Sequence, residues 1–212
     1  MKSRLITLFL VVLLCSCKSG SSSIPNTHSQ SLADPSIVQI QGTGWTSSGL
    51  GGTMSKPSSC HYSTSNGYTL PDPTCTPGAI DTTVTQANIF STICRRGGYT
   101  SSVRPPVSLT EPAKYLSMSA YGTSQSATKL EFDHLVPLGL GGASSLQNLW
   151  PQPDEGTPAT FDPQDPYGIN AKDGVEDRLH SAVCSDEVTL SAAQNAIATN
   201  WTIAESILGI TP

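Results

Sequence analysis

The sequence lacks four features that would each indicate a particular class of protein. Its longest apolar run, residues 5–14 with Thr7 as the interruption, is well short of the roughly 20 residues that a membrane-spanning helix needs. It has no excess of Lys and Arg, no Cys-x-x-Cys pair and no internal repeat. These absences argue against a transmembrane anchor, a globally basic nucleic-acid binder, a zinc knuckle and a repeat protein.

The start of the chain has the pattern of an export signal. Lys2 and Arg4 precede the apolar run, and Leu14-Cys15-Ser16-Cys17 follows it as a processing site. This site resembles a bacterial lipobox, in which the cysteine after the cut is diacylated on sulfur. The resemblance implies that residues 1–16 are a signal peptide and that Cys17 carries a lipid anchor to a membrane.

An ordinary secretory signal is the alternative to lipidation. A cut near Ser16 or Gly20 would also export the chain. If Cys17 is lipidated, the residues that follow, Lys18 and Ser19, lack the Asp that signals inner-membrane retention in many Gram-negative lipoproteins. We therefore expect a lipoprotein of the bacterial cell envelope, with the outer membrane preferred.

Acidic residues outnumber basic ones. The chain has 11 Lys and Arg against 16 Asp and Glu, and removal of Lys2 and Arg4 with the signal leaves 9 against 16, a net charge of −7. Any binding of nucleic acid must therefore use a local basic patch or a bound cation. The candidates for such a patch are Arg95, Arg96, Arg104, Lys114, Lys129 and Lys172. These residues are explained equally well as scattered charges that keep the surface soluble.

Beyond Cys17, four cysteines remain in the exported domain, and their even number in an oxidising compartment indicates two disulfides. Three pairings are possible. We favour Cys60 with Cys75, which closes a short loop, and Cys94 with Cys184, which joins two predicted helix ends. The sequence alone does not decide among the pairings.

Composition divides the exported chain into two parts. Residues 17–57 are dominated by Ser, Gly, Thr, Gln and Pro, which predicts a flexible tether with one short strand at residues 37–40. Residues 58–212 have the size of a single domain. Within it we expect helices from Asp81 or Thr82 to Cys94, at residues 112–121 and at residues 191–207, the last with Ile197, Trp201 and Ala204 at helical spacing.

The segment that carries chemistry is residues 131–150. It reads as a short strand, a glycine-rich turn and a second short strand, which predicts a hairpin. Asp133 and His134 are adjacent, so an extended strand points their side chains to opposite faces, and a bend is needed if both are to serve one site. Gly141-Gly142 is not followed by Lys-Ser or Lys-Thr, so we expect no nucleotide cofactor.

This segment resembles the HNH, or ββα-metal, nuclease family. The matching elements, in order, are Glu131-x-Asp133-His134-x-x-Pro137-Leu138, then Gly141-Gly142, then Asn148-Leu149. The resemblance implies that His134 is the general base that activates a water, that Asp133 binds a divalent cation and that Asn148 braces the hairpin. Imidazole suits the base because its ordinary pKa lies near neutrality.

The family's third element is a helix whose first turn supplies a metal ligand. Residues 170–184 form a helical stretch in this chain, which makes Asn170 the candidate ligand, with Glu131, Lys172 and Asp173 as possible supporting residues. His180 lies about 15 Å further along such a helix, so it cannot share the ion with Asn170. The cation expected is Mg²⁺, although Mn²⁺, Zn²⁺ or Ni²⁺ suit the same donors.

The fold class expected is α+β: a small ββα-metal centre within a mainly helical, disulfide-clipped single domain, residues 58–212, with its motif at residues 131–184. Two departures from the family are the 21 residues between Asn148 and Asn170 and the missing zinc knuckle.

The activity expected is metal-dependent hydrolysis of DNA or RNA. The alternative is a non-catalytic envelope lipoprotein that keeps the scaffold as a binding or structural module; a secreted antibacterial toxin fits poorly with a lipidation signal.

Overall fold

The computed structural model describes residues 37–155 and 170–210. The expected signal peptide and Cys17 lie outside these residues, as does most of the segment between Asn148 and Asn170. No helix in the described ranges has both the length and the apolar character that a bilayer crossing demands.

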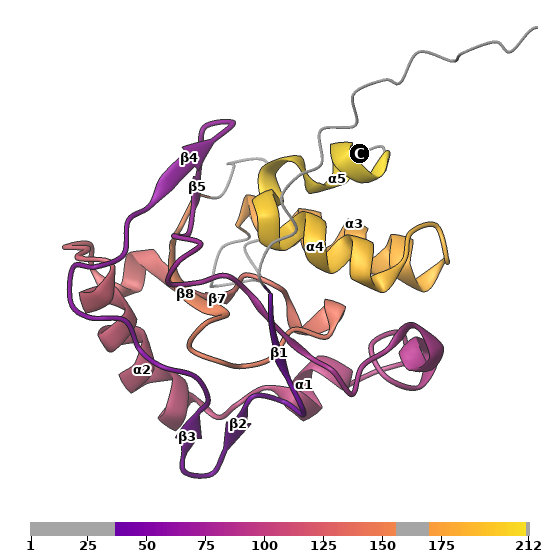
Figure 1. Cartoon of the computed structure of the whole chain (residues 1–212), viewed down its shortest axis with the longest axis horizontal. Helices are drawn as coiled ribbons and strands as arrows, with labels where there is room; N and C mark the ends of the chain where they lie inside the picture. Colours follow the sequence, from indigo (N-terminus) through magenta and orange to yellow (C-terminus); the bar gives the residue numbers. More distant parts are fainter. Residues whose placement is uncertain (1–36, 156–169, 211–212) are drawn as a thin grey trace, which may run out of the picture. The chain divides into compact units, whose positions relative to one another are not determined.

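The described chain is a mixture of helices and small two-stranded sheets (Figure 1). The strands are β1 (Val38–Ile40), β2 (Trp45–Thr46), β3 (Gly49–Leu50), β4 (Ser63–Ser65), β5 (Tyr68–Leu70), β6 (Ala79–Asp81), β7 (Leu130–His134) and β8 (Leu149–Pro153). The helices are η1 (Gln86–Ser91), α1 (Tyr99–Val103), α2 (Val107–Ala120), η2 (Ala127–Lys129), η3 (Leu138–Leu140), α3 (Ala171–Cys184), α4 (Leu190–Asn200), η5 (Trp201–Ile203) and α5 (Ala204–Leu208).

The predicted hairpin is present as the antiparallel pair β7–β8, in which Asp133 lies opposite Trp150 and His134 opposite Leu149. In the view of Figure 1, α2 lies on one side of this hairpin and the group α3–α5 on the other. The α3–α5 group supplies most of the larger core. In α3, Val175, Leu179 and Val183 are buried in it at the helical spacing expected.

The last helical region also follows its sequence pattern. The single helix predicted at residues 191–207 is divided into α4 and α5 by the short turn η5. Ile197, Trp201 and Ala204 are all buried in the larger core.

The helix predicted from Asp81 to Cys94 is wrong. Asp81 instead ends β6, and its carboxylate accepts hydrogen bonds from the backbone N–H groups of Gly42 and Thr83. Only the six-residue turn η1 forms in this region. The carboxylate that we expected to cap a helix is used to close a turn, because the strand pairing of residues 79–81 takes precedence.

The helix predicted at residues 112–121 exists, but it begins five residues earlier. It starts directly after Pro106, and Pro112 lies inside it. Pro112 is the sixth residue of the helix and has no N–H, so the carbonyl of Ser108 receives no helical hydrogen bond from it.

The short strand predicted at residues 37–40 is present as β1, but residues 41–57, which we predicted to be part of a flexible tether, are folded against the domain. β1 pairs in parallel with β6, and Gly51 forms a β-bridge with Ser145. The glycines of the segment 37–57 allow this close packing. At Gly44, an added Cβ would lie 3.0 Å from the backbone N of Ser144, which is too close for most side chains. The segment therefore folds by backbone contacts, which the scarcity of apolar residues did not indicate.

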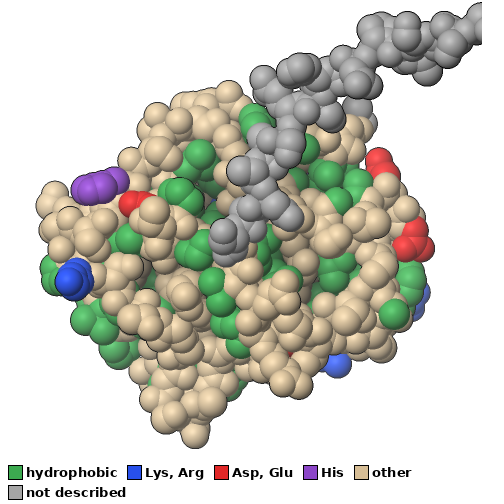
Figure 2. Space-filling model, viewed as in Figure 1, with side chains coloured by type: hydrophobic (Ala, Val, Ile, Leu, Met, Phe, Trp, Pro, Cys, Tyr) green, Lys and Arg blue, Asp and Glu red, His purple; other side chains and the backbone are tan. Residues whose placement is uncertain are grey.

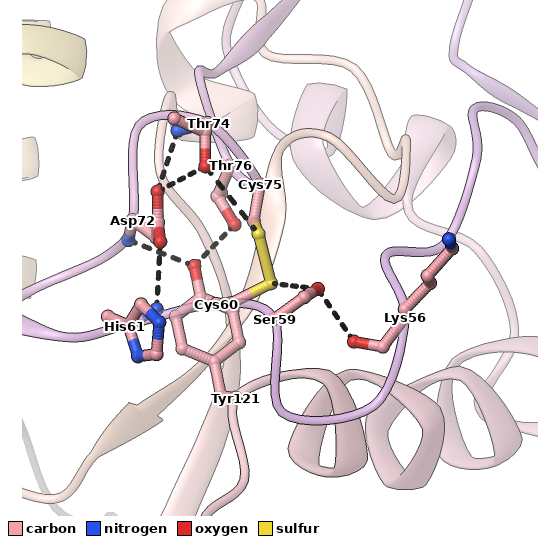
Figure 3. Close-up of a disulfide and its surroundings, with 9 residues drawn as sticks. All are labelled: Lys56, Ser59, Cys60, His61, Asp72, Thr74, Cys75, Thr76 and Tyr121. Carbon is pink, nitrogen blue, oxygen red and sulfur yellow. Dashed lines mark hydrogen bonds between the residues drawn. A yellow bond between two sulfur atoms is a disulfide. The ribbon is translucent and has the colours of Figure 1, made fainter.

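Both predicted disulfides are confirmed. Cys94–Cys184 joins the segment after η1 to the end of α3, and Cys60–Cys75 closes a short loop. Figure 3 shows the second bond beside Asp72, whose carboxylate accepts hydrogen bonds from the backbone of His61 and from Thr74. A smaller core of Cys60, Ala120, Tyr121, Leu135 and Trp150 lies next to it.

Candidate functional site

The turn between β7 and β8 is held from inside by Asn148. Its side-chain Oδ1 accepts a hydrogen bond from the backbone N of Val136 at 2.9 Å, and its Nδ2 donates to the carbonyls of Val136 and Ala143, both at 2.9 Å. The residue has no exposed surface. Asn148 therefore joins the two sides of the turn, which is the bracing role that the resemblance implies for it.

Glycine is required in the same turn because the backbone is crowded. A Cβ on Gly142 would lie 1.8 Å from the carbonyl oxygen of Val136, far inside van der Waals contact. The turn is also tied to distant segments, since Ser144 N donates to Thr43 O and Asp81 N donates to Gly141 O. The position of the turn thus depends on residues 43 and 81 as well as on the hairpin.

His134 ends β7 and faces this turn. Its Nε2 is 2.9 Å from the hydroxyl of Ser144, and the residue is 7% exposed. Burial, helped by the positive charges of Arg104 and Lys172, lowers the pKa of His134 to about 3. The imidazole is therefore neutral near pH 7 and has a nitrogen that can accept a proton.

Asp133 faces the other way, toward α3. Its Oδ2 is 2.8 Å from Lys172 Nζ and accepts a hydrogen bond from Trp150 Nε1 at 3.0 Å. The two residues of the Asp-His pair are therefore divided between two faces, as strand alternation requires. The bend that would bring both side chains to one point is not present.

Lys172 is the functional residue that the sequence did not identify as the partner of Asp133. Its side chain has no exposed surface, and its Nζ contacts Asp133, the carbonyl of His134 at 2.8 Å and Glu176. Burial alone would lower the pKa of the Lys172 ammonium, but Asp133 and Glu176 outweigh burial and raise it. In the sequence, the i,i+4 spacing of Lys172 and Glu176 indicated that these two side chains would pair on the helix, but nothing indicated the contact with Asp133.

Asn170 begins α3 as its N-cap and is held in a capping box with Asp173. Its Nδ2 donates to Glu131 Oε2 at 2.8 Å, and its Oδ1 accepts from the backbone N of Glu155 at 2.9 Å. Burial and the charge of Asp133 raise the pKa of Asp173 to about 6. Asn170 therefore lies beside Glu131 and Asp173, and its contact with β7 is made two residues before Asp133.

The structure thus places the predicted residues in two groups. Glu131, Asp133, Asn170, Lys172 and Asp173 gather where the first turn of α3 meets β7. His134 and Asn148 lie on the side of the turn between β7 and β8. Their catalytic and metal-binding roles remain predictions.

The candidate basic patch does not assemble from all of its members. Lys172 is buried, and Lys114 Nζ donates to the carbonyls of Ala127 and Leu130. Arg104 is exposed, and its charge acts on His134. On the face shown in Figure 2, Lys and Arg side chains are few and separated. Among the exposed members of the candidate patch, Arg104 is the one whose charge acts on His134.

Comparison with known proteins returns no relative: no family model, no curated protein and no solved structure matches this chain.

The first prediction concerns Asn148. Replacement by Asp keeps an acceptor for the Val136 N–H but removes both donated hydrogen bonds and sets a carboxylate against two carbonyls. We expect the free energy of unfolding to fall by about 3–5 kcal/mol, because two buried acceptors lose their partners. Urea denaturation measures this change. The same amide-to-acid change at the half-buried neighbour Gln147 is the control; equal losses in the two variants would refute the bracing role.

The second prediction concerns acid stability. Unfolded His134 takes up a proton near its ordinary pKa of 6.5, whereas folded His134 does so only near pH 3. Protons therefore favour the unfolded chain below pH 6.5, and stability falls by up to about 1.4 kcal/mol per pH unit from this residue. The raised pKa of Asp173 acts in the opposite direction, so denaturation of the wild type and of His134→Gln must be compared. Curves that stay parallel from pH 7 to pH 4 would contradict the assignment.

Proposed function

We propose that the chain is an exported, metal-dependent nuclease of the HNH type that hydrolyses phosphodiester bonds of DNA or RNA in the bacterial envelope. The observation that carries the proposal is the contact of the first turn of α3 with the end of β7. Asn170 binds Glu131, and Lys172 binds both Asp133 and the carbonyl of His134. A strand, a braced turn, a second strand and a helix start thus meet at the motif residues.

His134 supplies the proton acceptor in this proposal. Its imidazole is neutral near pH 7, and Nε2 is held by the Ser144 hydroxyl, which a water can replace. A pKa near 3 makes a weak base, but a bound phosphate would change that environment. The negative charge of a phosphate near Arg104 opposes the positive charges that lower the pKa of His134, and so strengthens the base when substrate is present.

Oxygen donors of the kind that a hard divalent cation prefers surround the contact of α3 with β7, although the carboxylates of Glu131, Asp133 and Asp173 do not all come within 4.8 Å of one another. Glu131, Asp133 and Asp173 each use one carboxylate oxygen in the contacts given above, and no described residue donates a hydrogen bond to the other oxygen of any of them. Lys172 is the only cation that contacts these carboxylates among the described residues. When bound, Mg²⁺ or Mn²⁺ would stabilise the charge that develops on the scissile phosphate.

Exported disulfide-bonded proteins reach compartments where such an activity could act on incoming nucleic acid. The two disulfides are compatible with export. Attachment to a membrane through Cys17 stays part of the proposal, since that residue lies outside the described ranges.

The third prediction tests catalysis. Purified protein is expected to nick supercoiled plasmid or to cut RNA in Mg²⁺ or Mn²⁺ and to lose the activity with a chelator. His134→Gln should lower the rate by a factor of about 10² or more, since general bases contribute 10²–10⁴. His61→Gln, which changes an exposed histidine away from the site, should cut at the wild-type rate. Cutting by His134→Gln at the wild-type rate would refute the mechanism.

A second function is favoured by one specific observation. Lys172 fills the space between Asp133 and Glu176 with a buried positive charge, as a bound cation would. An HNH-like scaffold with this internal cation would serve as a non-catalytic binding or structural module of the envelope, with no need for a metal.

The fourth prediction separates the two functions by calorimetric titration with Mn²⁺. The nuclease requires that the wild type binds Mn²⁺ and that Glu131→Gln binds it at least about tenfold more weakly, because a carboxylate donor is lost. The non-catalytic module requires that the wild type binds none up to millimolar metal and that Lys172→Met gains binding at the freed carboxylates of Asp133 and Glu176. Circular dichroism of each variant confirms that it is folded.

A further inference from the structure

A second group of potential metal ligands lies at the far end of α3, away from the HNH-like motif. Cys184 is the last residue of α3, His180 lies one turn earlier, and Cys94 follows η1. One ligand atom from each of these three residues lies within 4.8 Å of the others, and no other trio of His, Cys, Asp or Glu does so within the described ranges.

The local geometry aims the imidazole at the sulfurs. Residues four apart on a helix lie on the same face, so His180 and Cys184 are neighbours. His180 Nε2 is 3.4 Å from Cys184 Sγ and 3.0 Å from the carbonyl oxygen of Ile93. The two cysteine Cα atoms are 5.6 Å apart. All three residues are half-buried, so small ions and reductants can reach the group.

The oxidised form cannot use this group as a metal site, because a thiolate is the sulfur species that binds metal. Reduction by a thiol changes this: two reductant thiols are oxidised to a disulfide, and the Cys94–Cys184 bond becomes two cysteine thiols. Ile93, Leu179 and Val183 belong to the same hydrophobic core, so the two chain segments that carry the cysteines share buried contacts besides the disulfide. The two sulfurs and one imidazole then form a donor set of the kind that Zn²⁺ prefers.

Zn²⁺ binding requires two kinds of proton movement, one at the cysteines and one at His180. Each cysteine thiol releases its proton to solvent as its sulfur binds the ion. The proton on His180 Nε2, now directed at the Ile93 carbonyl, moves to Nδ1 so that Nε2 can bind. Three protein ligands leave the fourth tetrahedral position of Zn²⁺ to water.

We propose that the reduced chain binds one Zn²⁺ through Cys94, His180 and Cys184, and that the disulfide and the metal exclude each other. The site is independent of the proposed nuclease centre, which uses residues at the opposite end of α3.

The test uses the whole chain with Cys15 and Cys17 replaced by serine, so that these thiols do not contribute. A phosphine reduces the disulfides and is itself oxidised to the phosphine oxide with oxygen from water. We expect calorimetry to give about one more Zn²⁺ per reduced chain than per oxidised chain, because any Zn²⁺ at the proposed nuclease centre binds in both forms. Bound Co²⁺ should show thiolate-to-metal charge-transfer absorption, which reports sulfur ligands directly.

Three variants identify the ligands. His180→Asn should weaken the affinity for Zn²⁺ about tenfold or more, as expected for the loss of one of three ligands. His61→Asn, the matched histidine control, should not change it. Cys60→Ser with Cys75→Ser, which removes the other two thiols, should leave the difference between the reduced and the oxidised chain at one Zn²⁺.

The outcomes are decisive even if reduction unfolds the chain. In that case Zn²⁺ should restore the helical circular dichroism of the wild type at a concentration that leaves His180→Asn unfolded. Equal Zn²⁺ affinity of the reduced wild type and reduced His180→Asn, or no more Zn²⁺ bound by the reduced wild type than by the oxidised chain, would overturn the proposal.

Discussion

The ammonium of Lys172 is the contact on which the arrangement of the hairpin and α3 depends. It is fully buried, and a buried charge without partners is very costly, so its three oxygen partners must stay in place. The cost is greater near a helix start, where the helix dipole disfavours positive charge. Two partners belong to β7 and the third, Glu176, belongs to α3 itself. This one side chain therefore fixes how the strand and the helix meet.

Strand alternation then separates the motif into two chemical environments. Asp133 points to Lys172 and Trp150, in a region rich in carboxylates. His134 points to Ser144, in a turn that is tied by backbone hydrogen bonds to the segment before β2. In the proposed nuclease, the cation would be held on one side of the strand and the proton accepted on the other, so a phosphate would have to reach across the end of β7.

Several elements could be predicted from the sequence because local rules decide them. The buried face of α3 follows from the spacing of Val175, Leu179 and Val183, and the hairpin follows from two short apolar runs around a glycine turn. The even number of cysteines indicated two disulfides, whereas the sequence only favoured their pairing and the structure fixes it. Asn148 was recognisable because its order in the motif is specific, although only the structure gives its three hydrogen bonds.

Other elements could not be predicted because their partners are distant in the sequence. The segment 37–57 is too polar to suggest a folded part, yet its backbone pairs with residues near 80 and 145. Asp81 has a side chain that could cap a helix, but it closes a turn instead, because residues 79–81 form β6 and pair with β1. Sequence composition indicates how many apolar side chains a segment can bury. These contacts are made instead by backbone N–H and C=O groups, which do not depend on the side chain.

The sequence by itself predicted an export signal, which lies outside the described residues, and determined the motif order from Glu131 to Asn148, the helix capped by Asn170 and the even set of cysteines in the domain. The tertiary structure alone decided that Lys172 neutralises Asp133, that His134 is neutral and faces Ser144, and that His180 meets the Cys94–Cys184 pair. The physical reason is that patterns along the chain report which face a residue occupies. The charge, solvent access and protonation of a side chain depend on neighbours that only the fold brings to it.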